Sequence, residues 1–401
     1  MLSRKGRIAV LSFHSCPMGR IGGKDTGGMS IYLRELSREL QKLGFTLDIY
    51  TRLNGDKHPV LMKLYPGVRL IHLEAGPQEH LDKLQVYKYL NLFNLSLESF
   101  RREKGLHYDL IFSHYWLSGW AGLQLQKWWQ IPQVIMFHTL GAMKNASCRE
   151  EAEPRLRLET EKLLARRCQR VIAATKKEKE QLISLGAKPE NIRAVPCGVN
   201  LELFRPLDKK KSRQKLGLEA EKIILFVGRL EPIKGLKRLL RAAKYLKGRH
   251  GLKLVIVGGD EHSLEEIRML EKLAHSLQIR DMVSFLGLVD HEMLPYYYSA
   301  ADVCAVASYY ESFGLVALEA LSCGTPVVAT EVGILPEIIR QGETGYLLPN
   351  NCSASSLADR LAYFLDKNSR YPAAAVRETV SSFGWHDIAH QVKEVFDEMI
   401  S

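Results

Sequence analysis

The sequence lacks any apolar run long enough to cross a membrane as a helix. Its longest apolar stretches, such as LVIVGG at 254–259, are far shorter than the about 20 residues that a membrane-spanning helix needs. The N-terminus is basic, but it has no small-residue cleavage site and continues directly into a strand pattern. We therefore predict no signal peptide and expect a cytoplasmic protein.

Paired-cysteine motifs and metal-ligand motifs are missing as well. The seven cysteines are odd in number and scattered, without a CxxC pair: Cys16, Cys148, Cys168, Cys197, Cys304, Cys323 and Cys352. That distribution is expected of reduced thiols and not of a zinc site or a disulfide framework. The chain has neither a DxD nor an HExxH motif, so we predict no metal site and no cofactor.

The formal net charge of +11 indicates an anionic partner, which could be a nucleic acid, a membrane surface or a phosphorylated substrate. The basic clusters are short and dispersed, at 101–104, 165–167, 176–179 and 208–211, and none is interleaved with aromatic residues. Because grooves for single-stranded nucleic acid combine cations with stacking aromatics, no nucleic-acid partner is predicted. The charge alone does not decide between the other two partners.

Short apolar, β-branched runs alternate with helical patterns along the whole chain. The strand candidates are RIAVLSF (7–13), TLDIYT (46–51), VRLIHL (68–73), YDLIFSH (108–114), QVIMFH (133–138), RVIAAT (170–175), KIILFVG (222–228), LKLVIVGG (252–259), MVSFLG (282–287), DVCAVAS (302–308) and PVVAT (326–330). Between them lie segments such as 29–44, where leucines recur at helical spacing and Gly44 ends the helix. This alternation predicts an α/β fold with parallel sheets that are covered on both faces.

The chain length predicts two domains, because 401 residues are too many for one ordinary core. We expect the break near 195–217, where Pro196 and Pro206 precede a charge run and a new strand. The domains would then be 1–203 and 204–384. Two doubly wound domains that face each other form a cleft, and open α/β sheets bind their ligands at the carboxyl ends of the strands.

Two loops that follow strands could approach phosphate groups. The Gly-rich loop GRIGGKDTGGMS (19–30) precedes a helix, whose N-terminus offers N–H groups and partial positive charge; its spacing is not the GxGxxG of a dinucleotide site. In VGRLEPIKG (227–235), Arg229 and Lys234 could clamp a diphosphate. Alone, two such cations are more often solvated surface charges. His138, at the end of a strand candidate, is likewise more often structural than catalytic.

Glu311 and Glu319 bracket the apolar stretch ESFGLVALE, eight residues apart. On one helix, with a rise of about 1.5 Å per residue, they would lie about 12 Å apart. Glycosidase carboxylates lie about 5 to 9.5 Å apart, so a hydrolytic pair is disfavoured. One acid just before a helix and one along it, each receiving hydroxyls from a different part of an elongated ligand, is the better interpretation. On spacing alone, the interpretation that both residues are ordinary surface glutamates stays open.

Together these segments resemble the family 4 retaining glycosyltransferases of the GT-B fold, over nearly the whole chain. ESFGLVALEALSCGTPVVATEVG (311–333) looks like that family's E-x7-E region and the strand after it, and GRLEPIKG (228–235) looks like its diphosphate clamp. The GGM loop (27–29) looks like its N-terminal phosphate loop. WHDIAHQVKEVFDEMI (385–400) is similar to the helix that crosses back to the first domain.

The resemblance implies two facing doubly wound, Rossmann-like domains with a cleft between them. Residues 1–203, with a crossover helix at 385–401, would bind the acceptor, and 204–384 would bind a nucleotide sugar. The implied donor-binding residues are Gly28, Arg229, Lys234, Glu311, Ser312, Phe313, Gly314, Leu315 and Glu319. Glu319 would hold the ribose hydroxyls and Glu311 the hexose, while Arg229 and Lys234 would take the diphosphate with the Gly28 N–H.

The family retains the anomeric configuration, which implies front-face attack in which the leaving phosphate helps to deprotonate the acceptor. No protein nucleophile, metal or cofactor is then required. The implied catalytic residues are His138, Glu311, Arg229 and Lys234, with the backbone carbonyl of His138 near the anomeric carbon. The donor is expected to be UDP-linked glucose or N-acetylglucosamine.

Three further segments, AGPQEHLDK (75–83), SHYWLSG (113–119) and HTLGAMKN (138–145), look like one branch of the family. That branch contains the mycothiol-pathway enzyme that glycosylates inositol 1-phosphate, and the sucrose-phosphate synthases. The implied acceptor is a small phosphorylated polyol or sugar, of the inositol phosphate or fructose 6-phosphate type. Its implied contacts are Ser30, Lys83, Tyr115, Thr139 and Arg157. The chain departs from the branch at Ser30, where the mycothiol enzymes have Asn, and at Ile334, where a second glycine is common.

Two alternatives stay open within or near this fold. A membrane-surface glycosyltransferase could act on a phosphatidylinositol-like lipid through the basic first domain, but no long amphipathic basic helix lies near the GGM loop. A nucleotide-sugar epimerase on the same two-domain plan is disfavoured, because GRLEPIKG with E-x7-E belongs to transferases. Relatives of this branch are often dimeric, so a homodimer is a further possibility.

Overall fold

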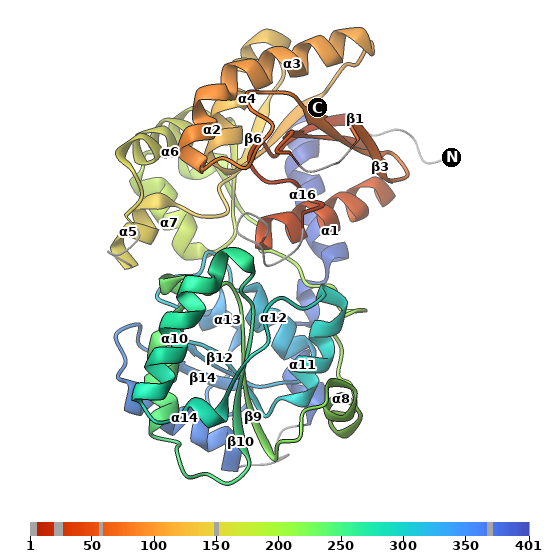
Figure 1. The fold of residues 1–401 in the computed structure, drawn as a ribbon. Helices are drawn as coiled ribbons and strands as arrows, with labels where there is room; N and C mark the ends of the chain where they lie inside the picture. The colour runs from red at the N-terminus through yellow and green to blue at the C-terminus, as the bar shows by residue number, and fades with distance from the viewer. Residues whose placement is uncertain (1–5, 20–26, 56–58, 148–151, 367–371, 401) are drawn as a thin grey trace.

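The structure is a computed structural model that describes residues 6–19, 27–55, 59–147, 152–366 and 372–400. Its two β-sheets, of eight and six strands, lie one above the other in Figure 1, and helices cover both faces of each. The larger sheet is built first along the chain and the smaller one second. This is the two-domain α/β fold that the alternation of strands and helices predicts.

The first sheet has the strand order β3-β4-β2-β1-β5-β6-β7-β8. Its strands are β1 (Gly6–Leu11), β2 (Phe45–Arg52), β3 (Leu61–Tyr65), β4 (Val68–Leu73), β5 (Leu110–His114), β6 (Gln133–Met136), β7 (Arg170–Ala173) and β8 (Ile192–Ala194). All adjacent pairs are parallel except β3 and β4, for which the parallel prediction is wrong. Only Pro66 and Gly67 (φ 74°) separate these two strands, and so short a turn reverses the chain.

The helices of the first domain are α1 (Gly28–Lys42), α2 (Lys83–Val86), α3 (Leu90–Glu103), α4 (Tyr115–Trp129), α5 (Gly141–Ser147), α6 (Arg155–Arg167) and α7 (Lys176–Ser184). The predicted end of α1 is confirmed, because Gly44 has φ 97° and its N–H donates to the carbonyl of Gln41 at 3.0 Å. Glycine is favoured at such a position since it adopts positive φ without a Cβ clash.

The second sheet has the order β11-β10-β9-β12-β13-β14, and all its adjacent strands are parallel. Its strands are β9 (Lys222–Val227), β10 (Leu252–Val257), β11 (Val283–Phe285), β12 (Val303–Val306), β13 (Val327–Thr330) and β14 (Gly345–Leu348). The helices after β8 are α8 (Lys209–Leu216), α9 (Leu236–Lys244), α10 (Leu264–Ser276), α11 (Leu294–Ala300), α12 (Leu315–Ser322), α13 (Leu335–Ile338), α14 (Ala354–Asp366), α15 (Ala373–Glu378) and α16 (Trp385–Ile400).

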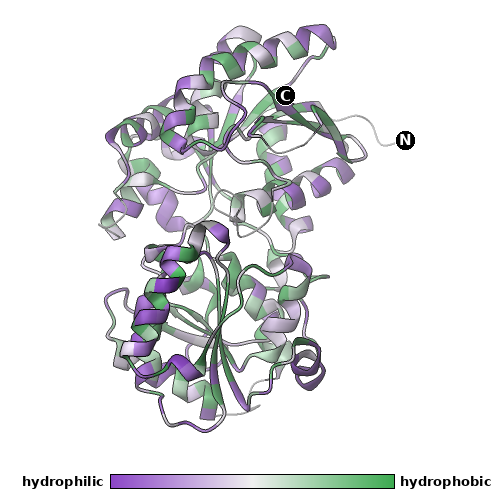
Figure 2. Cartoon of the chain, in the orientation of Figure 1, coloured by the Kyte–Doolittle hydropathy of each residue, from purple (hydrophilic) through white to green (hydrophobic). Residues whose placement is uncertain are grey.

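Each sheet has a hydrophobic layer on both faces, which explains why its strands are mostly apolar. In β1, Ile8 and Val10 pack in one buried cluster, while Ala9 and Leu11 pack in another on the opposite face. In Figure 2 the strands and the helix faces turned toward them are hydrophobic, and the outward faces are hydrophilic. Parallel sheets need such double cover, and successive side chains point to opposite faces. Within the described part of the chain, no helix has the length and apolarity needed to cross a membrane.

The chain crosses between the two domains twice, and the two crossings lie side by side. The N–H of Val199 donates to the carbonyl of Phe383 at 2.8 Å. The guanidinium of Arg377 donates to the carbonyls of Leu201 and Phe204, at 2.7 and 2.5 Å. One arginine therefore ties the outgoing crossing to the returning one.

The last helix, α16, packs against α1 on the first sheet, as Figure 1 shows for the blue helix beside α1. The ring of Phe396 lies edge-on to Phe45 and Phe112, with centroids 5.7 and 5.2 Å apart. Glu398 accepts hydrogen bonds from Arg170 and Arg193. The final helix therefore completes the core of the first domain.

Candidate active site

A cavity of about 340 Å³ lies between the two sheets, and residues of both domains line it. This volume is in the range of small-molecule sites. In the first sheet β1 stands between β2 and β5, and in the second β9 stands between β10 and β12. The loops beyond these central strands diverge, and ligands bind in the crevice that this divergence leaves. The cavity lies at that crevice in both domains.

On the second-domain side, the loops after β9 and β12 bring Lys234 and Glu311 together. The Nζ of Lys234 lies 2.8 Å from both carboxylate oxygens of Glu311. The Ser308 hydroxyl donates to the same carboxylate at 2.7 Å, so Glu311 has a fixed orientation. Both ends of the ion pair line the cavity. The cation and the acid that the sequence singled out separately are thus one unit.

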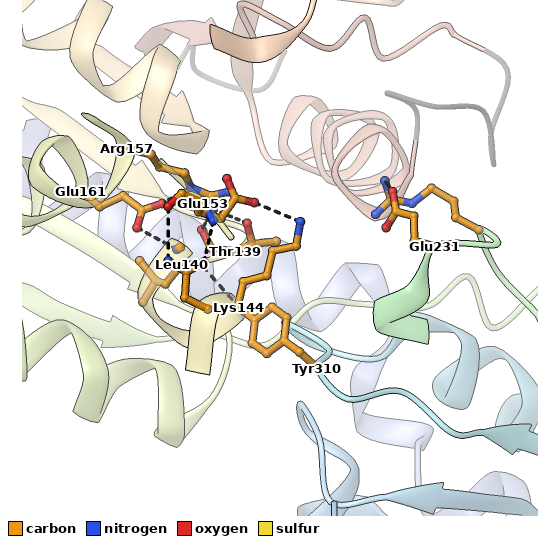
Figure 3. Close-up of polar contacts among 11 residues, drawn as sticks. Thr139, Leu140, Lys144, Glu153, Arg157, Glu161, Glu231 and Tyr310 are labelled. Atoms are coloured by element: carbon orange, nitrogen blue, oxygen red, sulfur yellow. Dashed lines mark hydrogen bonds and ion pairs between the residues drawn. The ribbon is translucent and has the colours of Figure 1, made fainter. Parts of the chain in front are cut away.

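Arg229, the other predicted clamp residue, also lines the cavity, and its Nη1 lies 2.5 Å from the Glu231 carboxylate. In Figure 3, Glu231 lies apart from the polar group around Arg157. Both clamp cations therefore face the cavity, and each has a carboxylate partner from its own domain.

Two helices begin at the cavity, one from each domain. Gly28 is the first residue of α1, and a Cβ built on it would lie 3.1 Å from Leu315 Cδ1, the first residue of α12. Gly314, before α12, has φ 111°, which favours glycine. Ser312 and Phe313 line the cavity beside it. Helix N-termini present N–H groups and partial positive charge, so this narrow place suits an anion.

Residues 20–26 of the predicted phosphate loop lie outside the described residues. Ile334, the departure from the family pattern, has an ordinary helical φ of −85° and is buried. Its N–H donates to the Phe313 carbonyl at 2.8 Å, and Gly333 before it supplies a φ of 57°. The loop therefore needs no glycine at position 334.

Glu319 lies on α12 and lines the same cavity as His138. Its Oε2 accepts a hydrogen bond from the Tyr298 hydroxyl at 2.7 Å, and its Oε1 lies 3.5 Å from His291 Nε2. Burial and the neighbouring Glu319 raise the pKa of Tyr298 well above its usual value, so the phenol stays protonated and donates. A buried phenol thus fixes one carboxylate oxygen, while Glu319 lines the cavity.

His138 follows β6 with a positive φ of 60°, and Tyr115 follows β5 with a φ of 75°. The other non-glycine residues with positive φ in the described chain, Gln130 and Gln278, lie just after helices, where this conformation is common. The two at the cavity have no such explanation. Strained backbone of this kind concentrates at functional sites.

The His138 ring is held by a second histidine. Its Nε2 lies 2.8 Å from the Nδ1 of His114, the last residue of β5. Burial lowers the pKa of His138 to about 3 and that of His114 well below its usual value. Both imidazoles are therefore neutral at neutral pH, and one ring donates to the other. His138 is thus placed as a hydrogen-bonding group and not as an acid.

Four residues predicted for the acceptor meet on the first-domain side. Arg157 Nη2 donates to Thr139 Oγ1 at 2.6 Å and to the Thr139 carbonyl at 3.0 Å. The Arg157 guanidinium lies 4.8 Å from the centroid of the Tyr115 ring, and Lys83 Nζ lies 5.8 Å from it. All four residues line the cavity. Ser30 does not: it is buried behind Ser15, with their hydroxyl oxygens 3.2 Å apart.

Several cavity residues were not among the predicted site residues: His14, Ser15 and Glu153 lie in no recognised segment, and Lys144 lies in HTLGAMKN (138–145) without an assigned role. The His14 ring lies 4.5 Å from that of Tyr115, and burial, Lys83 and Arg157 lower its pKa well below the usual value. His14 and Ser15 are the third and fourth residues after the first strand. Polar residues just after a buried parallel strand are the signal that could have found them.

Figure 3 shows the polar group around Arg157, with Lys144 and Glu153 beside it. Glu153 Oε1 lies 2.9 Å from Arg157 Nη1 and 3.0 Å from Lys144 Nζ. Arg157 Nε donates to Glu161 at 2.6 Å. The Tyr310 hydroxyl, from the second domain, accepts a hydrogen bond from the Leu140 N–H at 3.5 Å.

Among the described residues, no group of three or more His, Cys, Asp or Glu could hold a metal ion, and six cysteines are free.

Two family models match the chain, one to each domain. The model described as Glycosyltransferase Family 4 matches residues 26–203, and the model described as Glycosyl transferases group 1 matches 208–378. The D-inositol 3-phosphate glycosyltransferase 2 of Catenulispora acidiphila is 39% identical, and the alignment covers 100% of this chain and 96% of that protein. The D-inositol 3-phosphate glycosyltransferase of Mycobacteroides abscessus is 38% identical, with 98% and 90% covered.

Solved structures are similar over the whole length. Sucrose-phosphate synthase from Thermosynechococcus elongatus superposes with a TM-score of 0.90 at 34% identity, covering 98% of each chain. The Anabaena protein HepE, solved with UDP and glucose, has a TM-score of 0.76 at 21% identity, with 98% of this chain and 100% of HepE covered; it supports the fold alone. The chain therefore belongs to glycosyltransferase family 4, a retaining family, and has the GT-B fold.

Proposed function

We propose that this glycosyltransferase transfers glucose or N-acetylglucosamine from a UDP-sugar to a small phosphorylated polyol or sugar, without a metal. The second domain binds the nucleotide sugar and the first binds the acceptor. The relatives support this choice of acceptor, since one set is named for inositol 3-phosphate and the other for sucrose phosphate. D-inositol 3-phosphate is the same compound as L-inositol 1-phosphate, because the D and L conventions number the ring carbons in opposite directions.

The donor side of the proposal rests on charge and hydrogen-bonding capacity. Arg229 and Lys234 neutralise the diphosphate, together with the N-termini of α1 and α12. Glu319, oriented by Tyr298, accepts hydrogen bonds from the ribose hydroxyls, and Glu311 accepts hydrogen bonds from the hydroxyls of the hexose. With two cations and two helix N-termini at one place, the leaving diphosphate is stabilised without a cation from solution.

One observation carries the acceptor side: Lys83, Tyr115, Thr139 and Arg157 converge on one wall of the cavity. Two cations, a phenol and a hydroxyl provide charge and hydrogen-bond donors for phosphate oxygens. Lys83 and Arg157 lie on elements far apart in the chain, α2 and α6, so their convergence is a property of the folded site.

For the chemical step we propose front-face attack, a mechanism that needs no cavity carboxylate as a nucleophile. The acceptor hydroxyl attacks the anomeric carbon on the face from which the diphosphate leaves, and its proton passes to the leaving phosphate oxygen. The C–O bond to the acceptor forms as the C–O bond to the phosphate breaks, so configuration is retained. The neutral His138 ring and its backbone carbonyl lie beside the hexose and keep it in place.

The test is a screen of UDP- and GDP-sugars against D-inositol 3-phosphate, fructose 6-phosphate and the same compounds without phosphate, with products identified by mass. We expect one phosphorylated acceptor to react with a UDP-sugar, and the linkage to keep the donor's anomeric configuration by NMR. Lys83→Ala and Arg157→Lys should raise the acceptor KM, because Lys cannot reproduce the geometry of the guanidinium. Equal rates with phosphate-free acceptors would refute the proposal. Preferential turnover of phosphatidylinositol vesicles would favour a lipid acceptor instead.

A further inference from the structure

Glu153 bridges two cations of the acceptor wall with one oxygen. Its Oε1 lies 2.9 Å from Arg157 Nη1 and 3.0 Å from Lys144 Nζ, and all three residues line the cavity. Figure 3 shows the carboxylate between the guanidinium and the ammonium group. An anionic group of a ligand would favour the same place, since both cations face it.

Arg157 has little hydrogen-bonding capacity left for a ligand. A guanidinium carries five N–H groups, one on Nε and two on each terminal nitrogen. Nε donates to Glu161 at 2.6 Å, and Nη2 donates to both oxygens of Thr139. Nη1 is the nitrogen that Glu153 engages. An anion that reaches Arg157 from the cavity must therefore share Nη1 with Glu153 or replace the carboxylate there.

The backbone of Glu153 is held independently of its side chain. Its N–H donates to Asn145 Oδ1 at 2.6 Å, and Asn145 Nδ2 donates to its carbonyl at 3.3 Å. The side chain is 17% exposed, on the cavity side. The carboxylate can therefore rotate away from Arg157 while the main chain stays in place.

Charge favours such an exchange. Burial alone would raise the pKa of Glu153, but Arg157 and Lys144 lower it below its usual value, so the side chain is ionised at neutral pH. Glu161 already neutralises Arg157, whose side chain is only 3% exposed. A phosphate dianion added beside an ionised Glu153 would meet a like charge at close range. Replacement of one anion by the other avoids that repulsion.

We propose that Glu153 occupies, in the ligand-free enzyme, the place of the acceptor's anionic group, and that the acceptor phosphate displaces it. Lys144 then becomes an acceptor-binding residue alongside Lys83 and Arg157. This inference rests on the proposed function, since it requires an acceptor that carries a phosphate. The exchange is of ion pairs only, and no covalent bond forms or breaks.

The test compares Glu153→Gln with the wild-type enzyme. Removal of the competing charge should lower both the acceptor KM and the inhibition constant of inorganic phosphate about three- to tenfold, which corresponds to about one ion pair. Glu159→Gln is the matched control, because Glu159 lies on α6 with Arg157 but is 61% exposed and contacts Arg155 instead. Lys144→Met should raise the acceptor KM. An unchanged or higher KM and inhibition constant in Glu153→Gln would overturn the exchange.

The outcomes separate the two proposals. If the wild-type enzyme uses phosphate-free acceptors as well as phosphorylated ones, the proposed function is wrong. If it requires the phosphate but Glu153→Gln binds inorganic phosphate as the wild type does, only the role of Glu153 is wrong. Should Glu153→Gln fail to fold, Glu153→Asp applies the same test, since the shorter carboxylate reaches the two cations less well and should also lower both constants.

Discussion

The buried carboxyl group of Glu178 predicts a pH-dependent stability of the first domain. Glu178 lies on α7, only 4% exposed, and its Oε2 accepts from the Ala174 N–H at 2.7 Å. Its Oε1 has no hydrogen-bond partner among the described residues. Burial raises the pKa from its usual 4.5 to about 7, with a smaller contribution from the negative charge of Glu161. The folded domain therefore keeps this proton at pH values where the unfolded chain has lost it.

The magnitude of this change in unfolding free energy follows from the linkage between proton binding and folding. Between about pH 4.5 and pH 7 the folded state binds the extra proton, so the free energy of unfolding falls as the pH rises and levels off above pH 7. At about 1.4 kcal/mol per pKa unit, this difference amounts to about 3 kcal/mol. Glu178→Gln carries no charge at any pH. It should therefore be more stable than the wild type at pH 8 by up to about 3 kcal/mol, and by little near pH 5.

The assay is urea unfolding of wild-type and variant proteins from pH 5 to pH 8.5, with the difference in unfolding free energy plotted against pH. Glu180→Gln, on the same helix but exposed, is the matched control and should give a flat difference. A 13C-NMR titration of the Glu178 carboxyl carbon measures the pKa directly. A difference for Glu178→Gln that does not change with pH, or a carboxyl that titrates near pH 4.5, would refute the reasoning.

Three further predictions concern the donor side and the histidine pair. Lys234→Met should lower kcat/KM for the nucleotide sugar about 100- to 1000-fold, because we propose that this cation stabilises the leaving diphosphate; a change under tenfold in steady-state kinetics would contradict this role. Tyr298→Phe should raise the donor KM about fivefold, because Glu319 loses one hydrogen bond, and calorimetry with UDP should find the same loss. His114→Phe should lower kcat about tenfold, because the His138 ring loses its partner, and His114→Asn should restore part of it; equal rates in both variants would exclude positioning by His114.

The fold was predictable because its central strands carry a strong local signal. Strands such as β1 and β9 are buried on both faces and therefore contain unbroken apolar runs, at residues 8–11 and 223–227. The strands that the pattern missed, β3, β8 and β14, lie at the edges of their sheets and have three to five residues. β3 has no buried residue, so its apolar side chains show no periodicity that a strand prediction could use.

The site was predictable only where a short segment carries its chemistry. Lys234 and Glu311 each stand in a recognisable segment, but that they form one ion pair depends on β9 and β12 being adjacent. Glu153 stands in no recognised segment and Lys144 had no role assigned within HTLGAMKN, because their arrangement depends on the contacts that Glu153 makes with Lys144 and Arg157 in the folded chain. The resemblance implies Ser30 as an acceptor contact, yet the first turn of α1 directs it behind Ser15.

The return of α16 to the first sheet has a consequence for how the chain folds during synthesis. Phe45 and Phe112 are covered by Phe396, which is translated only after the entire second domain. The second domain can reach its native core on the ribosome first, while one face of the earlier-made sheet still waits for its last layer. A fragment ending near residue 203 would expose that apolar face. Separate production of the first domain would therefore require α16, joined by a short linker across the two paired crossings.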